Sequence, residues 1–396
     1  MSPSAARTGR LLRVVGINAL ILLLGLGLVE LALRGAGVRH PAFYRPDPIR
    51  GYSLRPGASG FWTREGRGSV TINSDGLRDV EHRRARQPGV LRVAVLGDSF
   101  SEALQVNLED TWWKQLERGI NAQPGCALRR GFPGGVEIIN FGVGGYGTGL
   151  ELLTWRQQAR RYAPELVLLA MYLGNDIEDN TPQARPDLPV FRFAPDGSLT
   201  IDRGFLQSPG SRLRFSPIGR LVDALVGHSA LLQLANEAKN RAAASRNGHA
   251  RPDLIQELNG PPDPSQGWAM TAALLRTLRE EVSASGAQLL VTSLSTPAQV
   301  YPDQALRRRL LPGGGPGLFA REQRLQALLD PLGVTYLPLA PDLQQRADRQ
   351  GLSLHGFPGQ QPGLGHWNQQ GHRLAAELLA ERLCTLAPVG AINKQP

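Results

Sequence analysis

The sequence predicts an α/β protein: a three-layer α/β/α sandwich around a five-stranded parallel sheet, preceded by an N-terminal transmembrane helix. Two observations predict this class. Five short apolar runs alternate with helical segments between residues 90 and 388, which is the pattern of parallel strands joined by crossover helices. One longer apolar run lies before them, and the charged residues on its N-terminal side are all arginines.

The long apolar run at residues 14–33 reads VVGINALILLLGLGLVELAL, close to the ~20 apolar residues that a bilayer-spanning helix needs. Three arginines precede it, so the positive-inside rule places residues 1–13 in the cytoplasm and the rest of the chain on the far side. Glu30 lies near the end of the run, where a charged side chain can reach the interface. We expect an uncleaved anchor. A cleaved signal peptide is the alternative, although residues 35–37 make a poor cleavage site.

Residues 41–89 contain no long periodic segment and carry turn signals, so we expect a short irregular β lead-in there. In the domain that follows, residues 90–388, the expected strands are 91–98, 136–142, 165–174, 287–294 and 335–340. The expected helices are 110–121, 150–162, 269–285, 320–332 and 368–386.

The stretch at residues 177–266 interrupts this alternation. It is rich in Pro, Arg and Ala and contains one amphipathic pattern near residues 221–241. A structureless loop of this length is uncommon in a compact domain. We therefore expect an inserted subdomain or lid.

The composition excludes several classes of function. The formal charge is +10, but only three of the 44 basic residues are lysines, and the arginines fall in small scattered groups without aromatic residues between them. This distribution indicates solvated surface charge rather than a nucleic-acid-binding face. Two cysteines are too few for a disulfide-stapled scaffold, and no His/Cys cluster suggests structural zinc.

The two cysteines are Cys126 and Cys384, and export would place them in an oxidising compartment. Cys126 follows the first helix of the domain, and Cys384 lies near the end of its last helix. In a flavodoxin-like strand order these helices share one face of the sheet and end on the same side. A disulfide and two unpaired buried thiols are both compatible with the sequence.

Polar residues and glycines stand at the carboxyl ends of the expected strands, where ligands bind in open α/β sheets. Ser99 follows the first strand, a glycine-rich segment (142–147) the second and Asn175 the third, while His366 comes just before the last helix. A serine, a glycine loop, an asparagine and a histidine at one edge are the parts of a nucleophile, a base and an oxyanion hole.

Four segments in this order resemble the four sequence blocks of the SGNH/GDSL hydrolase superfamily. They are LGDSF (96–100), NFGVGGYG (140–147), GND (174–176) and HWN-x-x-GH (366–372). The preceding NSDGLRD (73–79) is similar to the lead-in of membrane-anchored bacterial members. The resemblance covers residues 50–386, and it implies a location in the bacterial inner membrane with the main domain on the periplasmic or extracellular side.

The resemblance also implies roles for particular residues. Ser99 would be the nucleophile and His366 the base. The backbone N–H groups of Ser99 and Gly145 and the side-chain amide of Asn175 would form the oxyanion hole. No metal and no cofactor are implied.

The sequence departs from the superfamily at one place. The acid that orients the histidine normally stands two or three residues before it, where this chain has Leu364 and Gly363. Three explanations remain open: a Ser–His dyad oriented by a backbone carbonyl, an acid from elsewhere such as Asp342 or Asp348, or loss of activity.

A serine–histidine pair with an oxyanion hole performs acyl transfer. The resemblance therefore predicts a serine-dependent esterase acting on acylated carbohydrate or lipid in the cell envelope. The alternatives are an O-acyltransferase that uses the same residues and a catalytically silent glycan-binding envelope protein that lacks the acid.

The segment 142–147 also matches the dinucleotide fingerprint G-x-G-x-x-G. It follows the second strand rather than the first, and the position ~20 residues on, where an acid would bind ribose, begins a strand instead of ending one. We expect no nucleotide partner.

Overall fold

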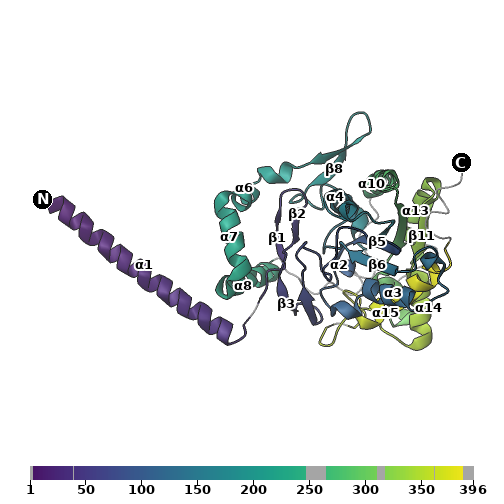
Figure 1. The fold of residues 1–396 in the computed structure, drawn as a ribbon, viewed down its shortest axis with the longest axis horizontal. Helices are drawn as coiled ribbons and strands as arrows, with labels where there is room; N and C mark the ends of the chain where they lie inside the picture. The colour runs from purple at the N-terminus through teal and green to yellow at the C-terminus, as the bar shows by residue number, and fades with distance from the viewer. Residues whose placement is uncertain (1–2, 39, 247–264, 310–316, 361, 387–396) are drawn as a thin grey trace. The chain divides into compact units, whose positions relative to one another are not determined.

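The computed structural model describes residues 3–38, 40–246, 265–309, 317–360 and 362–386 (Figure 1). These residues form two compact units. The first comprises Met1–Ala42 and Pro217–His249, and the second comprises Phe43–Ser216 and Ala250–Pro396.

The second unit is built on a five-stranded sheet whose order is β11-β10-β7-β5-β6 and in which every neighbouring pair is parallel. The strands are β5 (Val90–Gly97), β6 (Gly135–Asn140), β7 (Leu166–Met171), β10 (Gln288–Ser293) and β11 (Thr335–Pro338). The predicted flavodoxin-like order is confirmed. β5 lies between β6 and β7 in the sheet. The chain adds β6 on one side of β5 and then β7, β10 and β11 on the other side. The carboxyl ends of β5, β6 and β7 therefore lie at a topological switch point.

The strands are apolar because both faces of the sheet are covered. Every residue of β7 is buried, and β5 is buried throughout apart from Val90. Helices on one face pack their leucines against the sheet from α4, α10 and α13, and helices on the other face do so from α3, α14 and α15 (Figure 1). The three-layer sandwich predicted from the sequence is confirmed.

The five predicted helices appear in the predicted order as α3, α4, α10, α13 and α15; α10 is longer than predicted, the other four are shorter, and further short helices lie between them. The helices of this unit are α2 (Ser99–Glu102), α3 (Trp112–Asn121), α4 (Thr148–Gln157), α5 (Asp176–Asp179), α6 (Pro209–Phe215), α10 (Ser265–Ala284), α11 (Pro297–Val300), α12 (Gln304–Arg309), α13 (Ala320–Leu329), α14 (Ala340–Gln350) and α15 (Gln369–Leu383). Short 3-10 helices are η1 (Leu108–Asp110), η2 (Ala127–Arg129), η3 (Ala159–Tyr162), η4 (Gly204–Gln207) and η5 (Asp330–Leu332). Helix α14 was not predicted, because its few buried positions lie among polar residues.

Three antiparallel hairpins accompany the sheet. The lead-in forms two of them, β1 (Tyr44–Asp47) with β2 (Gly51–Leu54) and β3 (Ser59–Trp62) with β4 (Gly68–Thr71). The third, β8 (Val190–Phe193) with β9 (Leu199–Asp202), lies in the stretch where an insertion was expected.

Segment 73–79 binds the lead-in to the sheet region through hydrogen bonds. The buried guanidinium of Arg78 donates to the carbonyl oxygen of Glu102 at 3.1 Å, and the Asp79 carboxylate accepts from the backbone N–H of Asn140 at 3.0 Å. These bonds reach the end of α2, the helix that follows β5, and the end of β6, so the lead-in contacts the edge of the sheet where the candidate residues lie.

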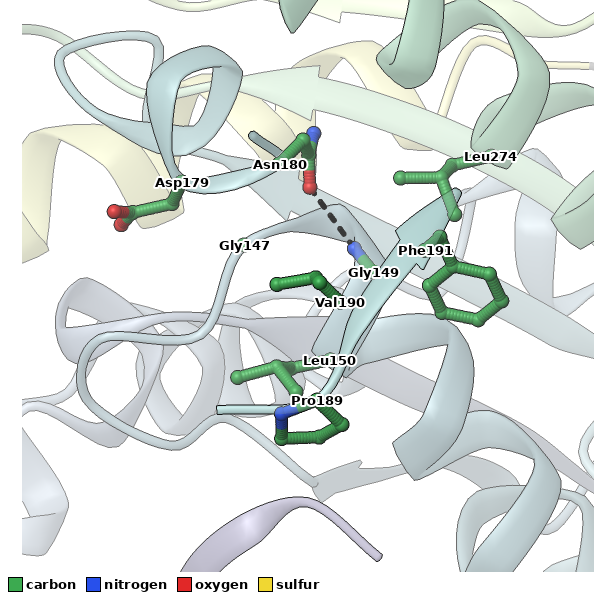
Figure 2. Close-up of a pocket in the computed structure, with 9 residues that line it drawn as sticks. All are labelled: Gly147, Gly149, Leu150, Asp179, Asn180, Pro189, Val190, Phe191 and Leu274. Atoms are coloured by element: carbon green, nitrogen blue, oxygen red, sulfur yellow. Dashed lines mark hydrogen bonds between the residues drawn. The ribbon is translucent and has the colours of Figure 1, made fainter. Parts of the chain in front are cut away.

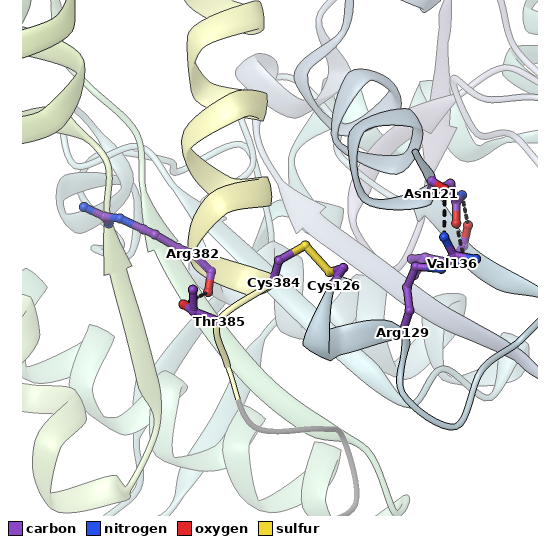
Figure 3. The surroundings of a disulfide bond; sticks show 7 residues. All are labelled: Asn121, Cys126, Arg129, Val136, Arg382, Cys384 and Thr385. Atoms are coloured by element: carbon purple, nitrogen blue, oxygen red, sulfur yellow. Dashed lines mark hydrogen bonds between the residues drawn. A yellow bond between two sulfur atoms is a disulfide. The ribbon is translucent and has the colours of Figure 1, made fainter. Parts of the chain in front are cut away.

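A disulfide joins the helices that cover one face of the sheet (Figure 3). Helices α3 and α15 lie side by side, and Cys126, just after α3, is bonded to Cys384 at the end of α15. The backbone N–H of Ala127 also donates to the Cys384 carbonyl at 3.0 Å. Of the two alternatives left open by the sequence, the structure has the disulfide.

The first unit consists of α1 (Pro3–Gly35), α7 (Pro217–His228) and α8 (Ala230–Arg246). Within α1, Leu12–Gly35 is long and apolar enough to cross a membrane, with a mean hydropathy of 2.3 and no buried residues. The single helix expected near residues 221–241 is two helices. The helix is interrupted at Ser229. The Ser229 hydroxyl accepts the N–H of Leu232 at 3.2 Å at the start of α8.

Candidate active site

Ser99 stands at the first position of α2, immediately after β5. The buried Asp98 caps this helix, because its carboxylate accepts the backbone N–H of Phe100 at 2.9 Å. The preceding Gly97 leaves room for the turn, since a Cβ there would lie 2.4 Å from the Ser101 hydroxyl. This tight turn presents the Ser99 side chain at the edge of the sheet. Burial raises the pKa of Asp98 to about 6.

The structure brings His366 to Ser99. The imidazole Nε2 lies 2.8 Å from the Ser99 hydroxyl, a hydrogen-bond distance. The Phe100 ring packs on the imidazole with centroids 4.9 Å apart, which fixes the ring's position. The His366 side chain is 29% exposed, so the site is open to solvent.

Glu65 holds the opposite edge of His366. One carboxylate oxygen lies 2.5 Å from the imidazole Nδ1, and the other accepts the His366 backbone N–H at 2.7 Å. This two-point contact fixes both the ring and the backbone that carries it. It also assigns the proton of the neutral imidazole to Nδ1 and leaves Nε2 as an acceptor toward Ser99.

The Glu65–His366 contact changes the pKa of both groups. Burial acts to lower the pKa of His366, but the hydrogen bond and the negative charge of Glu65 outweigh it, so the pKa is raised above its ordinary value. Burial acts to raise the pKa of Glu65, but its bonds to His366 outweigh this effect and the pKa is lowered. The carboxyl group of Glu65 is therefore ionised at neutral pH.

Tight packing brings the loop between β3 and β4 to this position. A Cβ at Gly68 would lie 2.2 Å from the Leu104 carbonyl oxygen, and a Cβ at Gly66 would lie 2.6 Å from that of Gln105. The hairpin therefore packs directly on the segment that follows α2. On the other side, a Cβ at Gly365 would lie 2.2 Å from a Glu65 carboxylate oxygen, so a larger residue there would displace the carboxylate from His366.

The acids proposed from the sequence point elsewhere. Asp342 accepts a hydrogen bond from Arg382, and Asp348 accepts one from Arg307 at 2.5 Å. The structure places Glu65, rather than either aspartate, at Nδ1 of His366. The sequence did not single out Glu65, because the acid was expected just before the histidine or, failing that, at a position such as Asp342 or Asp348.

The two positions where the superfamily has its acid are unsuitable in this chain. Gly363 has φ +81°, and a Cβ there would lie 2.8 Å from the Tyr301 ring. Leu364 is buried and packs with Ala298 in a small apolar cluster. A carboxylate at either position would meet aromatic or aliphatic groups rather than the imidazole.

His355 supports the loop that carries His366. Its Nδ1 lies 2.6 Å from the Gly365 carbonyl oxygen, and it pairs with Trp367 in an isolated β-bridge. Burial lowers the pKa of His355 to about 4, so the ring is neutral and donates from Nδ1. No signal in the sequence singled out this residue.

Gly145 and Asn175 lie on the turns after β6 and β7. The Asn175 amide nitrogen donates to the Asp179 carboxylate at 2.9 Å, and Arg185 donates to the Gly145 carbonyl at 2.6 Å while lying 3.7 Å from the same aspartate. Arg185 and Asp179 thus connect the two turns. Gly145 has φ +74°, a conformation that favours glycine.

A small pocket borders these turns (Figure 2). Its empty volume, counted with the solvent at its mouth, is about 260 Å³. Figure 2 shows the Asn180 side chain accepting the Gly149 N–H, at 3.0 Å, across one wall. The lining residues are Gly147, Gly149, Leu150, Asp179, Asn180, Pro189, Val190, Phe191 and Leu274. Asp179, which lines this pocket, also accepts the hydrogen bond from the Asn175 amide.

Buried carboxyl groups lie close to the same turns. Burial raises the pKa of Glu102 to about 7, and it raises those of Glu151 and Asp176 well above their usual values. Both carboxyl oxygens of Glu151 lack a hydrogen-bond partner among the described residues. Burial therefore favours the protonated form of both carboxyl groups. Within the described ranges, no group of three or more His, Cys, Asp or Glu side chains could hold a metal ion.

Comparisons with known proteins give similar solved structures only. No family model matches the chain, and no curated protein matches it by sequence. The acetyl xylan esterase AlAXEase is 11% identical over 74% of this chain and 99% of its own, with a TM-score of 0.38. A catalytic mutant of the acetylxylan esterase Axe2 from Geobacillus stearothermophilus is 8% identical over 74% and 94%, also at 0.38.

Proposed function

We propose that this protein is a serine-dependent ester hydrolase with Ser99 as nucleophile, His366 as general base and Glu65 as the acid that orients the imidazole. One observation supports this most directly. Glu65, His366 and Ser99 form a continuous series of contacts, 2.5 Å from carboxylate to Nδ1 and 2.8 Å from Nε2 to the hydroxyl. A nucleophile held by a base, which is itself oriented by a third group, is the arrangement that activates serine.

In the proposed reaction, His366 Nε2 takes the hydroxyl proton of Ser99 as the serine oxygen attacks the ester carbonyl carbon. The oxyanion accepts hydrogen bonds from the backbone N–H groups of Ser99 and Gly145 and from the Asn175 amide. The imidazolium then gives its proton to the leaving alcohol, and an acyl-serine remains. A water molecule, deprotonated by His366, releases the acid and restores the serine.

This mechanism requires a neutral imidazole in the free enzyme. Since Glu65 raises the pKa of His366 above its usual 6.5, protonation of His366 begins to inhibit above that pH. Activity should therefore rise with pH along a limb that lies above pH 6.5 and level off once the imidazole has lost its proton.

We propose that α1 is an uncleaved anchor and that the esterase unit lies on the periplasmic or extracellular side. The arginines before the apolar segment favour this orientation, and the Cys126–Cys384 disulfide fits an oxidising compartment. Together with the superfamily resemblance, this location supports acylated carbohydrate or lipid of the cell envelope as the substrate class.

The main argument for a catalytically silent glycan-binding protein was the absence of an acid beside His366. Glu65 occupies that position, so the argument no longer holds. An O-acyltransferase would use the same residues with a hydroxyl acceptor in place of water. Product analysis with an acetylated oligosaccharide, with and without a second unacetylated sugar, separates transfer from hydrolysis.

The test of the proposal uses the full chain in detergent and a fluorophosphonate probe, which reacts with activated serines. Wild type should be labelled and Ser99→Ala should not, while Ser198→Ala, a change at an exposed serine, should label like wild type. Equal labelling of Ser99→Ala, or no labelling of folded wild type, would overturn the assignment of Ser99.

A further inference from the structure

Helix α7 carries an exposed apolar stripe. Ile218, Leu221, Val222 and Leu225 are spaced as i, i+3, i+4 and i+7, which places them on one face of the helix. Their exposed fractions are 68%, 60%, 51% and 49%. Single exposed apolar residues are common on soluble proteins, but a helix face made of four of them is typical of a contact surface.

The C-terminal end of α7 is bound to α1. The Arg34 guanidinium donates to the carbonyl oxygen of His228, the last residue of α7, at 2.6 Å. The Glu30 carboxylate accepts the Ser229 hydroxyl and the backbone N–H of Ala230, both at 2.9 Å. The junction between α7 and α8 is therefore bound to the final turns of the candidate transmembrane segment.

The helical rise places this junction at the membrane surface. At about 1.5 Å per residue, Leu12–Gly35 extends ~36 Å, slightly more than the ~30 Å hydrocarbon core. Glu30 lies five residues before the end of α1, roughly 7 Å along the axis. A carboxylate and a guanidinium at this depth lie near the boundary between acyl chains and headgroups, where polar groups find water.

We propose that α7 lies in the lipid–water interface on the far side of the membrane, with its apolar stripe among the outer acyl chains. A helix with an apolar face that is held at this depth satisfies that face by entering the interface. A lipid surface is favoured over a second protein because the contacts of Glu30 and Arg34 hold the end of α7 against the candidate transmembrane segment. The proposal is independent of ester hydrolysis, and it requires α1 to span the bilayer.

The native cysteines make a specific test available. Both are in the disulfide, so a single introduced cysteine is the one free thiol of the folded chain. We would attach the environment-sensitive fluorophore NBD to Leu221→Cys on the stripe, to Arg220→Cys on the opposite face and to Leu22→Cys within α1. The labelled full-length proteins would be reconstituted into vesicles of phosphatidylethanolamine and phosphatidylglycerol.

Two quenchers report the surroundings of each label. Doxyl-labelled lipid should quench the labels at positions 221 and 22 several-fold more strongly than the label at 220, and aqueous iodide should show the reverse order. Leu225→Cys provides a second stripe position if Leu221→Cys fails to fold. Fluorophosphonate labelling of Ser99 reports whether the catalytic unit of each variant is intact.

Three results would overturn the proposal. Iodide quenching at 221 equal to that at 220 would place the stripe in water. Protection at 221 and 225 from both quenchers would show that protein covers the stripe. A label at position 22 that doxyl lipid does not quench would remove the transmembrane premise. Absence of esterase activity in the unmodified wild-type chain, with the lipid quenching pattern found in the labelled variants, would overturn the proposed function and leave this inference standing.

Discussion

The parallel sheet and the lead-in hairpin contribute to the candidate site in different ways. The sheet supplies Ser99, Gly145 and Asn175 from turns that directly follow β5, β6 and β7. The hairpin β3–β4 supplies Glu65, which lies 301 positions before its partner His366. The first contribution follows from strand order, whereas the second follows from the way one loop packs on another.

This difference shows which residues of the candidate site are positioned by strand pairing and which depend on the packing of a single loop. Turns after neighbouring parallel strands converge whenever the sheet forms, because strand pairing sets their positions. The hairpin reaches His366 only because glycines allow its backbone to approach the segment after α2 closely. Changes in the sheet region should therefore affect folding or the chemical step directly, while changes in the hairpin should act through His366.

The disulfide is the strongest test of the sheet region. Replacing both Cys126 and Cys384 with serine opens a loop of 258 residues, and chain entropy predicts a loss of about 5 kcal/mol in unfolding free energy. Denaturant unfolding measures this loss. The value of kcat at low temperature should stay near wild type, because neither cysteine contacts the site. A loss of kcat in the folded variant would contradict this separation of stability from chemistry.

Asn175→Ala tests the sheet's contribution to catalysis. If Asn175 is an oxyanion donor, as proposed, its loss should lower kcat about 10²- to 10³-fold, because the amide would act on charge that develops in the transition state. The pH dependence should be that of wild type, since the Glu65–His366 contact is untouched. Steady-state kinetics from pH 5 to 9 measure both. A shifted pH profile would indicate that Asn175 acts through His366.

A substitution of His82 tests the contact between the end of the lead-in and strand β6 of the sheet. Its Nδ1 lies 2.8 Å from Glu137 on β6, and its Nε2 lies 3.1 Å from Asp79. Burial acts to lower the pKa of His82, but these carboxylates outweigh it and raise the pKa to about 9. The stabilisation is fully present below pH 6.5 and is lost as pH rises through 9, by about 3 kcal/mol. His82→Gln should remove this dependence, as unfolding at pH 6 and pH 10 would measure.

Gly66→Ala tests the hairpin itself and has the smallest expected effect. Gly66 has φ +63°, and a Cβ would lie 2.6 Å from the Gln105 carbonyl oxygen, so alanine should displace the loop that carries Glu65. We expect kcat to fall about tenfold, with a cost of about 1–2 kcal/mol in stability.

The matched control for that change is Gly57→Ala. Gly57 also lies in the lead-in with φ +73°, but nothing stands within 4 Å of a Cβ there. It should cost similar backbone strain without a change in kcat. If both variants lose kcat equally, the effect comes from the lead-in as a whole rather than from the placement of Glu65.

The sequence was sufficient to predict the fold and to propose most residues of the candidate site. Continuous apolar strands and helical spacing predicted the sheet, and the strand ends placed Ser99, Gly145 and Asn175 at one edge. Each of these inferences depends on residues close together in the chain. Predicted bounds ran a few residues too long where polar or glycine residues end the strands, as at residues 141–142 after β6.

Glu65 could not be predicted, because nothing near it in sequence resembles an active-site block. Its role depends on the close packing of Gly66 and Gly68 on the chain after α2 and on the space left by Gly365. The glycines around it were the only available signal, and glycines are common throughout this chain. For the same reason, burial of Glu151 and Asp176 was invisible until the sheet and its helices were assembled.

The most direct test of the account compares kcat/KM of Glu65→Gln with that of Asp342→Asn and Asp348→Asn across pH. If Glu65 orients His366 and raises its pKa, Glu65→Gln should lower kcat/KM about 10²- to 10⁴-fold and move the acid limb to lower pH, because the pKa of His366 falls toward 6.5. The two aspartate variants should match wild type. Wild-type activity and an unchanged acid limb in Glu65→Gln would contradict the proposed role of Glu65 in orienting His366 toward Ser99.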